Sequence, residues 1–193
     1  MAKAKRPPKS EQEVLPIGEL FIDQLAKESD RGCVLVAAAM LDEALEFLLR
    51  CNMSKEDALV KVCVDPLFVG LGPLKSFWAK IQLTRALGHI DQWMYDDLER
   101  IRNLRNFFAH TYSDADFANP RVVAITERLV GADKAVRSMS KRPQLGKIVP
   151  DRLIRDTRIQ DRPIVKKERM RFTLAASYIG GRIHRKCVPQ QHV

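Results

Sequence analysis

The sequence predicts an all-α protein: a single helical bundle of six or seven helices, with a basic C-terminal arm and a final helix. Two observations carry this prediction. Apolar side chains recur every three or four residues in several segments, which is the spacing of one face of an α-helix. Helix start and stop signals bound many of these segments. The 193 residues, 46% hydrophobic and 30% charged, suit one globular domain with its own core.

The first two predicted helices follow from apolar spacing. Residues 15–27 form the first, and the second extends from Asp30 to about Cys51, with Ser29 as its N-cap. Three consecutive alanines at 37–39 widen the apolar surface of the second helix, so we expect it to be central. Its predicted seam has alternating spacings of four and three and consists of Val34, Ala38, Leu41, Leu45 and Leu48.

The middle of the chain is predicted to contain three further helices. A capping box that begins at Ser54 starts a short helix to about Val62. Residues 65–74 hold two Pro and two Gly and are predicted to form a loop. A helix over residues 75–87 follows, closed by Gly88, and the next covers residues 91–108.

The last third of the chain is less regular. Asn119 and Pro120 start a helix that Gly131 is expected to stop, and residues 165–185 read as the final helix, weakened by two adjacent glycines. The predicted organisation is a basic flexible tail (1–14), a helical core domain (15–133), a basic linker or arm (134–164), a C-terminal helix that packs on the core (165–187) and a tail (188–193).

Positive charge is concentrated at the C-terminal end. Residues 134–193 carry 16 basic and four acidic side chains, a net of +12, whereas the chain as a whole has +9. Such asymmetry indicates a DNA or RNA partner, or a solvated segment that keeps the protein in solution. Neither a helix-turn-helix nor a zinc finger is found. The candidate nucleic-acid contacts are Lys141, Arg142, Lys147, Arg152, Arg155, Arg158, Arg162, Lys166 and Lys167.

One charged residue interrupts the apolar stripe of the helix over residues 91–108. Arg105 lies about 20° from Met94 on a helical wheel, so it is expected on the seam. A buried guanidinium needs an anionic partner. The internal candidates are three carboxylates of the second helix: Asp42, Glu43 and Glu46.

Three motifs together resemble the mannitol operon repressor family. They are the loop Asp65-Pro-Leu…Gly-Pro-Leu74, the segment Lys80-Ile-x-Leu-x-x-Ala-Leu-Gly-x-Ile90, and the ending Leu104-Arg105…His110. The likeness covers about three quarters of the chain. Members of that family are all-helical bacterial transcription regulators without a standard DNA-reading motif. The resemblance therefore implies a repressor-like regulator that acts through DNA or through a regulatory protein partner.

The ending Arg105-Asn106-x-x-Ala-His110 also resembles the Arg…His motif of HEPN domains, helical bundles that include metal-independent ribonucleases. In that family two protomers bring their motifs together, so the resemblance implies a homodimer. It would make Arg105 a stabiliser of phosphorane charge, Asn106 its polar neighbour, and His110 a general acid or base. On a continuous helix, however, five residues turn about 140°, which separates Arg105 from His110.

Four cysteines show neither a Cys-x-x-Cys pair nor a histidine at ligand spacing, so we expect reduced structural thiols, no metal site and no cofactor. No apolar run reaches the ~20 residues of a membrane helix. The basic start of the chain is not followed by an apolar stretch, and a cytoplasmic location without membrane attachment is therefore expected.

Overall fold

The computed structural model describes residues 21–22, 24–111, 115–140 and 163–187. Every regular element in these ranges is helical, which confirms the all-α prediction. Six of the described helices have seven residues or more, and shorter helical turns between residues 57 and 68 make a seventh. In chain order the elements are α2 (Asp30–Cys51), α3 (Asp57–Leu59), the π-helical turn η2 (Val60–Val64), α4 (Asp65–Phe68), α5 (Phe77–Ala86), α6 (Gln92–His110), α7 (Pro120–Thr126), α8 (Val130–Ser140) and α10 (Pro163–Cys187).

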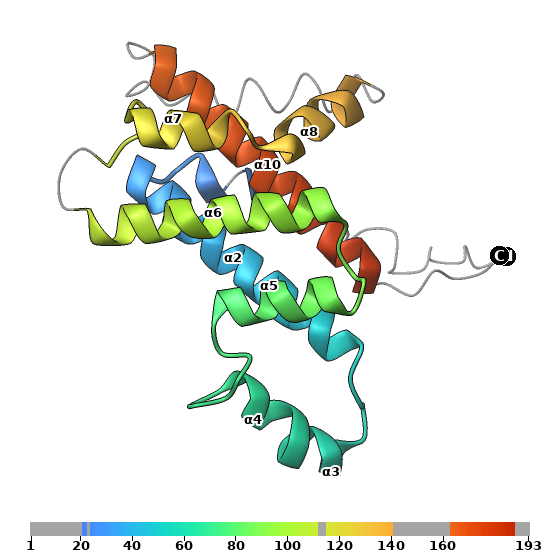
Figure 1. The fold of residues 1–193 in the computed structure, drawn as a ribbon. Helices are drawn as coiled ribbons and strands as arrows, with labels where there is room; N and C mark the ends of the chain where they lie inside the picture. Colours follow the sequence, from blue (N-terminus) through green and yellow to red (C-terminus); the bar gives the residue numbers. More distant parts are fainter. Residues whose placement is uncertain (1–20, 23, 112–114, 141–162, 188–193) are drawn as a thin grey trace, which may run out of the picture.

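Helix α2 is the centre of the bundle, and α5, α6 and α10 all pack against it (Figure 1). Its start is the predicted one, because the Ser29 hydroxyl accepts a hydrogen bond from the Gly32 amide at 3.0 Å. The predicted seam is confirmed, since all five of its side chains are buried. The three- and four-residue spacing therefore identified the face of α2 that meets its neighbours.

Helix α10 is part of the core, although it lies far along the chain from α2 (Figure 1). Its buried face, which includes Phe172 and Ile179, contributes to the same apolar cluster as α2 and α6. A Cβ atom at Gly180 would lie 2.6 Å from Cζ of Phe21. This glycine therefore lets an aromatic ring pack against the helix, and its cost in helix propensity is the condition for that contact.

Helices α6 and α8 are joined by a buried carboxylate. Asp97 accepts hydrogen bonds from the amides of Gly131, at 2.6 Å, and Val130, at 3.2 Å, in the first turn of α8. Burial raises the pKa of Asp97, and these bonds oppose the shift. The expectation that Gly131 stops a helix is wrong, because α7 ends at Thr126 and Gly131 lies in the first turn of α8, which begins at Val130. Helix α8 continues through residues 133 and 134, between which the sequence predicts the boundary of the core domain and the basic linker.

The α3–η2–α4 segment projects from one end of the bundle (Figure 1). The predicted loop over residues 65–74 is wrong for its first four residues, which form the helix α4. Pro66 lies in the opening turn of that helix, where a missing N–H is tolerated. The Ser54 hydroxyl accepts from the Glu56 amide and does not cap α3. Arg50 anchors the segment: Nη1 lies 2.7 Å from Asp65 Oδ1, and the guanidinium lies 4.3 Å from the ring centre of Phe68.

Candidate functional site

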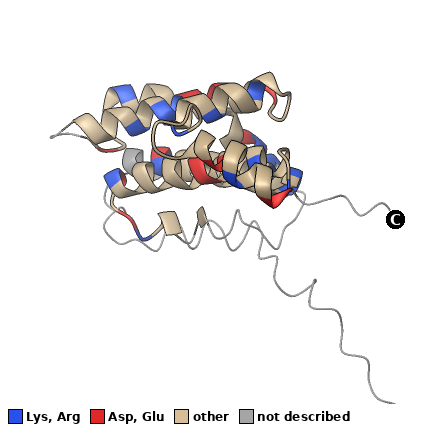
Figure 2. Ribbon diagram, turned by 90° about the horizontal axis from the view of Figure 1, so that it is seen from below, with Lys and Arg blue, Asp and Glu red and all other residues tan. Residues whose placement is uncertain are grey.

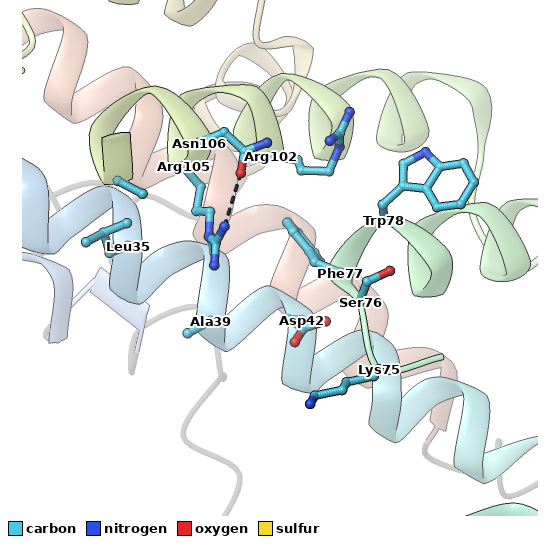
Figure 3. A pocket seen from close by; sticks show the side chains of 12 residues that line it. Leu35, Ala39, Asp42, Lys75, Ser76, Phe77, Trp78, Arg102, Arg105 and Asn106 are labelled. Carbon is cyan, nitrogen blue, oxygen red and sulfur yellow. Dashed lines mark hydrogen bonds between the residues drawn. The ribbon is translucent and has the colours of Figure 1, made fainter. Parts of the chain in front are cut away.

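A pocket of about 650 Å³ opens between α2, the start of α5 and the last two turns of α6 (Figure 3). Three separate stretches of the chain line it, so the pocket depends on the tertiary fold. Its lining residues are Leu35, Ala38, Ala39 and Asp42 of α2; Lys75, Ser76, Phe77 and Trp78 at the start of α5; and Arg102, Arg105, Asn106 and Ala109 of α6.

The edge formed by the start of α5 is held by local backbone chemistry. The Ser76 hydroxyl accepts a hydrogen bond from the Ala79 amide at 3.1 Å and caps the helix. Just before it, the loop folds back so closely that a Cβ at Gly72 would lie 2.2 Å from the Pro66 carbonyl oxygen. Only glycine fits there. The loop thereby places Lys75 and Ser76 at the mouth of the pocket.

Lys80 contacts the pocket residue Asp42: its side chain is only 4% exposed, and its ammonium lies between two carboxylates of α2. Its Nζ is 3.0 Å from Asp42 Oδ1 and 2.9 Å from Glu46 Oε2. Burial raises the pKa of Asp42 against the influence of Lys80. Burial also acts to raise the pKa of Glu46, but hydrogen bonds from Lys80 and Arg50 outweigh it and lower that pKa.

The structure does not pair Arg105 with the carboxylates expected for it. Its side chain is exposed, and Nη1 donates to Oδ1 of the adjacent Asn106 at 3.1 Å. Asp42 and Glu46 form ion pairs with Lys80 instead, and Glu43 is exposed. The apolar part of the predicted stripe is correct, because Met94, Leu98, Ile101 and Phe108 are all fully buried. Between Ile101 and Phe108 the buried position is Leu104 and not Arg105, so only the placement of Arg105 on the seam is wrong.

The two residues of the ribonuclease motif do not converge within one chain. Helix α6 continues unbroken to His110, and the Thr111 amide still donates to the Phe107 carbonyl oxygen at 3.0 Å. Arg105 and Asn106 line the pocket, whereas His110 is exposed and is not among the lining residues. The helical rotation of about 140° between Arg105 and His110 is therefore maintained.

Most of the candidate nucleic-acid contacts lie outside the described residues. These are the seven basic residues from Lys141 to Arg162. Lys166 belongs to α10, but only its backbone is described. Lys167 is exposed, and its Nζ lies 3.2 Å from Glu168 and 3.6 Å from Glu127.

The described residues contain no cluster of three or more His, Cys, Asp or Glu side chains able to hold a metal ion. All four thiols are free, and burial raises the pKa of Cys33 to about 11. Among the described helices, none combines the length and apolar character needed to cross a bilayer.

Comparison with known proteins gives a consistent result. A family model described as "Mannitol repressor" matches residues 21–176. The mannitol operon repressor of Escherichia coli K12 is 30% identical over 98 residues, which are 51% of this chain and 50% of that protein. The same protein of E. coli O6:H1 gives identical figures. The alignment thus spans half the length of these curated relatives.

Two solved structures share the fold. A possible transcriptional regulator, YggD from Shigella flexneri, superposes with a TM-score of 0.66 at 16% identity and covers 86% of this chain and 98% of its own. The chain in the MtlR–HPr complex from E. coli superposes with a TM-score of 0.63 at 21% identity, with the same coverage. The family model covers most of the described bundle, from Phe21 to Ala176. The chain therefore belongs to the mannitol repressor family.

Proposed function

We propose that this protein is a repressor-type regulator of bacterial transcription that acts by binding another protein. The family match over residues 21–176 is the observation that carries the proposal. Its curated relative is named a mannitol operon repressor, and a solved relative with the same fold was captured in a complex with HPr. The resemblance of the Arg105–His110 ending to HEPN domains also leads us to propose a homodimer, which sedimentation of the purified protein tests.

The described core favours a protein partner over nucleic acid because many of its basic side chains are already neutralised. Figure 2 shows Lys and Arg interleaved with Asp and Glu along the helices. Nucleic-acid binding by charge requires cations that are free to contact phosphates. The basic residues engaged in ion pairs with described carboxylates are Arg50, Lys80, Arg100, Arg102, Lys167, Arg169, Arg171 and Arg182.

The projecting α3–η2–α4 segment and the loop after it offer an apolar contact surface. Four large apolar side chains are exposed there: Leu59 at 44%, Val62 at 74%, Val69 at 60% and Leu71 fully. Exposed apolar side chains gathered in one segment are typical of protein interaction sites. The Arg50–Asp65 contact and the apolar cluster around Leu74 hold this segment against the end of α2.

Calorimetric titration with purified HPr tests partner binding. Val69→Asp and Leu71→Asp should each weaken binding at least about tenfold, because each places a charge in an apolar contact. Leu87→Asp, at an exposed site after α5, is the matched control and should bind as the parent does. Unchanged binding by both loop variants would exclude this surface.

Regulation itself is tested by deleting the gene and measuring transcription of the mannitol operon with a reporter. Transcription should rise on deletion and fall again when the parent protein is restored. A strain in which transcription responds to neither step would refute the repressor function, whatever HPr does in the calorimeter.

The basic C-terminal segment favours a second route, direct contact with DNA. Deleting the whole basic segment by truncation after Asp133 would not test DNA binding, because α10 belongs to the core and its loss would unfold the bundle. Changing the basic residues of 141–162 to Gln in the full-length chain is the sharper test. If they contact duplex DNA, a mobility shift at low salt should disappear, and each lost phosphate contact should reduce the salt slope by about 0.9. A parent protein without any shift at low salt excludes this route.

A further inference from the structure

The pocket between α2, α5 and α6 is lined by two cations, Lys75 and Arg105, that form no ion pair with a described carboxylate, although the charge of Arg105 acts to lower the pKa of Asp42. Within the described part of the chain, neither Lys75 nor Arg105 makes an ion pair, and both side chains are exposed. The other charges at the pocket are already matched. Arg102 Nη2 lies 2.9 Å from Glu99 Oε2, and Asp42 is paired with Lys80. Three of the charged residues that line the pocket are basic and one, Asp42, is acidic, so positive charge is in excess there.

Neutral hydrogen-bond donors add to these cations. Ser76 caps α5, so the amides of Phe77 and Trp78 in the first turn have no partner within the helix, and both residues line the pocket. The N-terminus of a ten-residue helix favours an anion through its dipole. Asn106 accepts from Arg105 through Oδ1, which leaves its NH₂ group able to donate.

The shape of the pocket suits a small molecule. Its volume of about 650 Å³ falls in the usual range of ligand sites. Ala38 and Ala39 have small side chains, so they fill little of the space beside α2. The Trp78 ring also lines the pocket and is half exposed. Figure 3 shows Arg105 extending from α6 toward α2, while Asp42 and Lys75 face the pocket from the other side. Asp42 offers a carboxylate that can accept from ligand hydroxyl groups.

We propose that this pocket binds a small organic phosphate, a phosphate monoester on a hydroxylated carbon skeleton. The phosphate oxygens contact Lys75, Arg105 and the first-turn amides of α5. The skeleton lies on the alanine wall beside Trp78, and its hydroxyl groups donate to Asp42. The site is separate from the apolar surface proposed for the protein partner, so either can fail without the other.

Calorimetric titration with glucose 6-phosphate, glucose and inorganic phosphate as probes tests the site. Glucose 6-phosphate should bind, inorganic phosphate should bind more weakly, and glucose should give no heat. Arg105→Gln and Lys75→Gln should each weaken glucose 6-phosphate binding about tenfold or more, because each removes a charge-assisted hydrogen bond. Arg128→Gln removes the same charge from an exposed residue outside the pocket and should leave binding unchanged.

Tryptophan fluorescence locates the bound probe. Trp78 lines the pocket and Trp93 does not, so the change in emission on adding glucose 6-phosphate should persist in Trp93→Phe and vanish in Trp78→Phe. The proposal is overturned if neither phosphate probe binds, if glucose binds as tightly as its phosphate, or if Arg105→Gln and Lys75→Gln bind as Arg128→Gln does. Circular dichroism of each variant confirms that the fold is retained.

Discussion

Replacing Lys80 with Met should destabilise the protein by about 2–3 kcal/mol, which is less than the loss of a fully buried ion pair. Lys80 is a buried residue of α5, and its ammonium lies within 3.0 Å of both Asp42 and Glu46. Methionine retains most of the apolar stem and removes only the charged end. The change therefore leaves two carboxylates without their shared cation and creates little empty volume.

The magnitude follows from how far water reaches the stranded carboxylates. Removing one member of a fully buried ion pair costs about 3–5 kcal/mol. Here Asp42 and Glu46 remain 30% and 28% exposed, so solvent screens part of that penalty. Glu46 also keeps Arg50, whose Nε lies 2.9 Å away. For a chain of this size, a loss of about 2–3 kcal/mol lowers the melting temperature by roughly 4–12 °C.

Urea unfolding at pH 7, followed by circular dichroism, measures the change. Lys61→Met is the matched control, because Lys61 is exposed in η2, and it should unfold at the parent's midpoint. The double variant Lys80→Met with Asp42→Asn should recover part of the loss, since it removes one stranded charge. A Lys80→Met midpoint equal to the parent's, or a double variant less stable than the single one, would refute the reasoning.

Three further predictions use the same unfolding assay or a direct one. Because the pKa of Glu46 is lowered on folding, its stabilisation is present above its unfolded pKa near 4.5 and is lost as the pH falls through the lower folded value; Glu46→Gln should therefore flatten the acid limb of the stability profile. Asp97→Ala should cost about 2 kcal/mol, because the amides of Val130 and Gly131 lose their acceptor. Purified parent protein without metal should leave single-stranded RNA intact, as should His110→Ala, whereas cleavage to a 2′,3′-cyclic phosphate that His110→Ala abolishes would revive the ribonuclease alternative.

The features that the sequence predicted well depend on local chemistry. Ser29 and Asn119 cap their helices as expected, since a short polar side chain needs only the amide two or three residues ahead. Gly88 adopts the positive φ, 74°, that its place after α5 predicts. The apolar seam of α2 is likewise a property of one helix. Such signals act within a few residues, so one sequence is enough to find them.

The features that were missed depend on contacts between distant segments. Lys80 and Asp97 are buried charged residues: Lys80 pairs with carboxylates more than 30 residues away in the chain, and Asp97, besides its local ion pair with Arg100, accepts from amides that are equally distant. One signal could have identified Lys80: it lies three residues after Phe77 and four before Thr84, on the inward face of α5. Nothing local indicates that Asp97 caps a helix that begins at Val130. Only the packing of α6 against α8 brings the Asp97 carboxylate to the amides of Val130 and Gly131.

The exchange of Arg105 for Lys80 as the partner of the α2 carboxylates also decides what Arg105 does. Had Arg105 paired with Asp42, it would be a structural residue, and its loss would destabilise the fold. Because Lys80 pairs with Asp42 and Glu46, the guanidinium of Arg105 lines the pocket without an ion-pair partner among the described residues. Arg105→Gln should therefore leave the urea midpoint close to the parent's, while Lys80→Met lowers it. If instead Arg105→Gln destabilises the protein as much as Lys80→Met does, the guanidinium is part of the framework and cannot be assigned to a ligand.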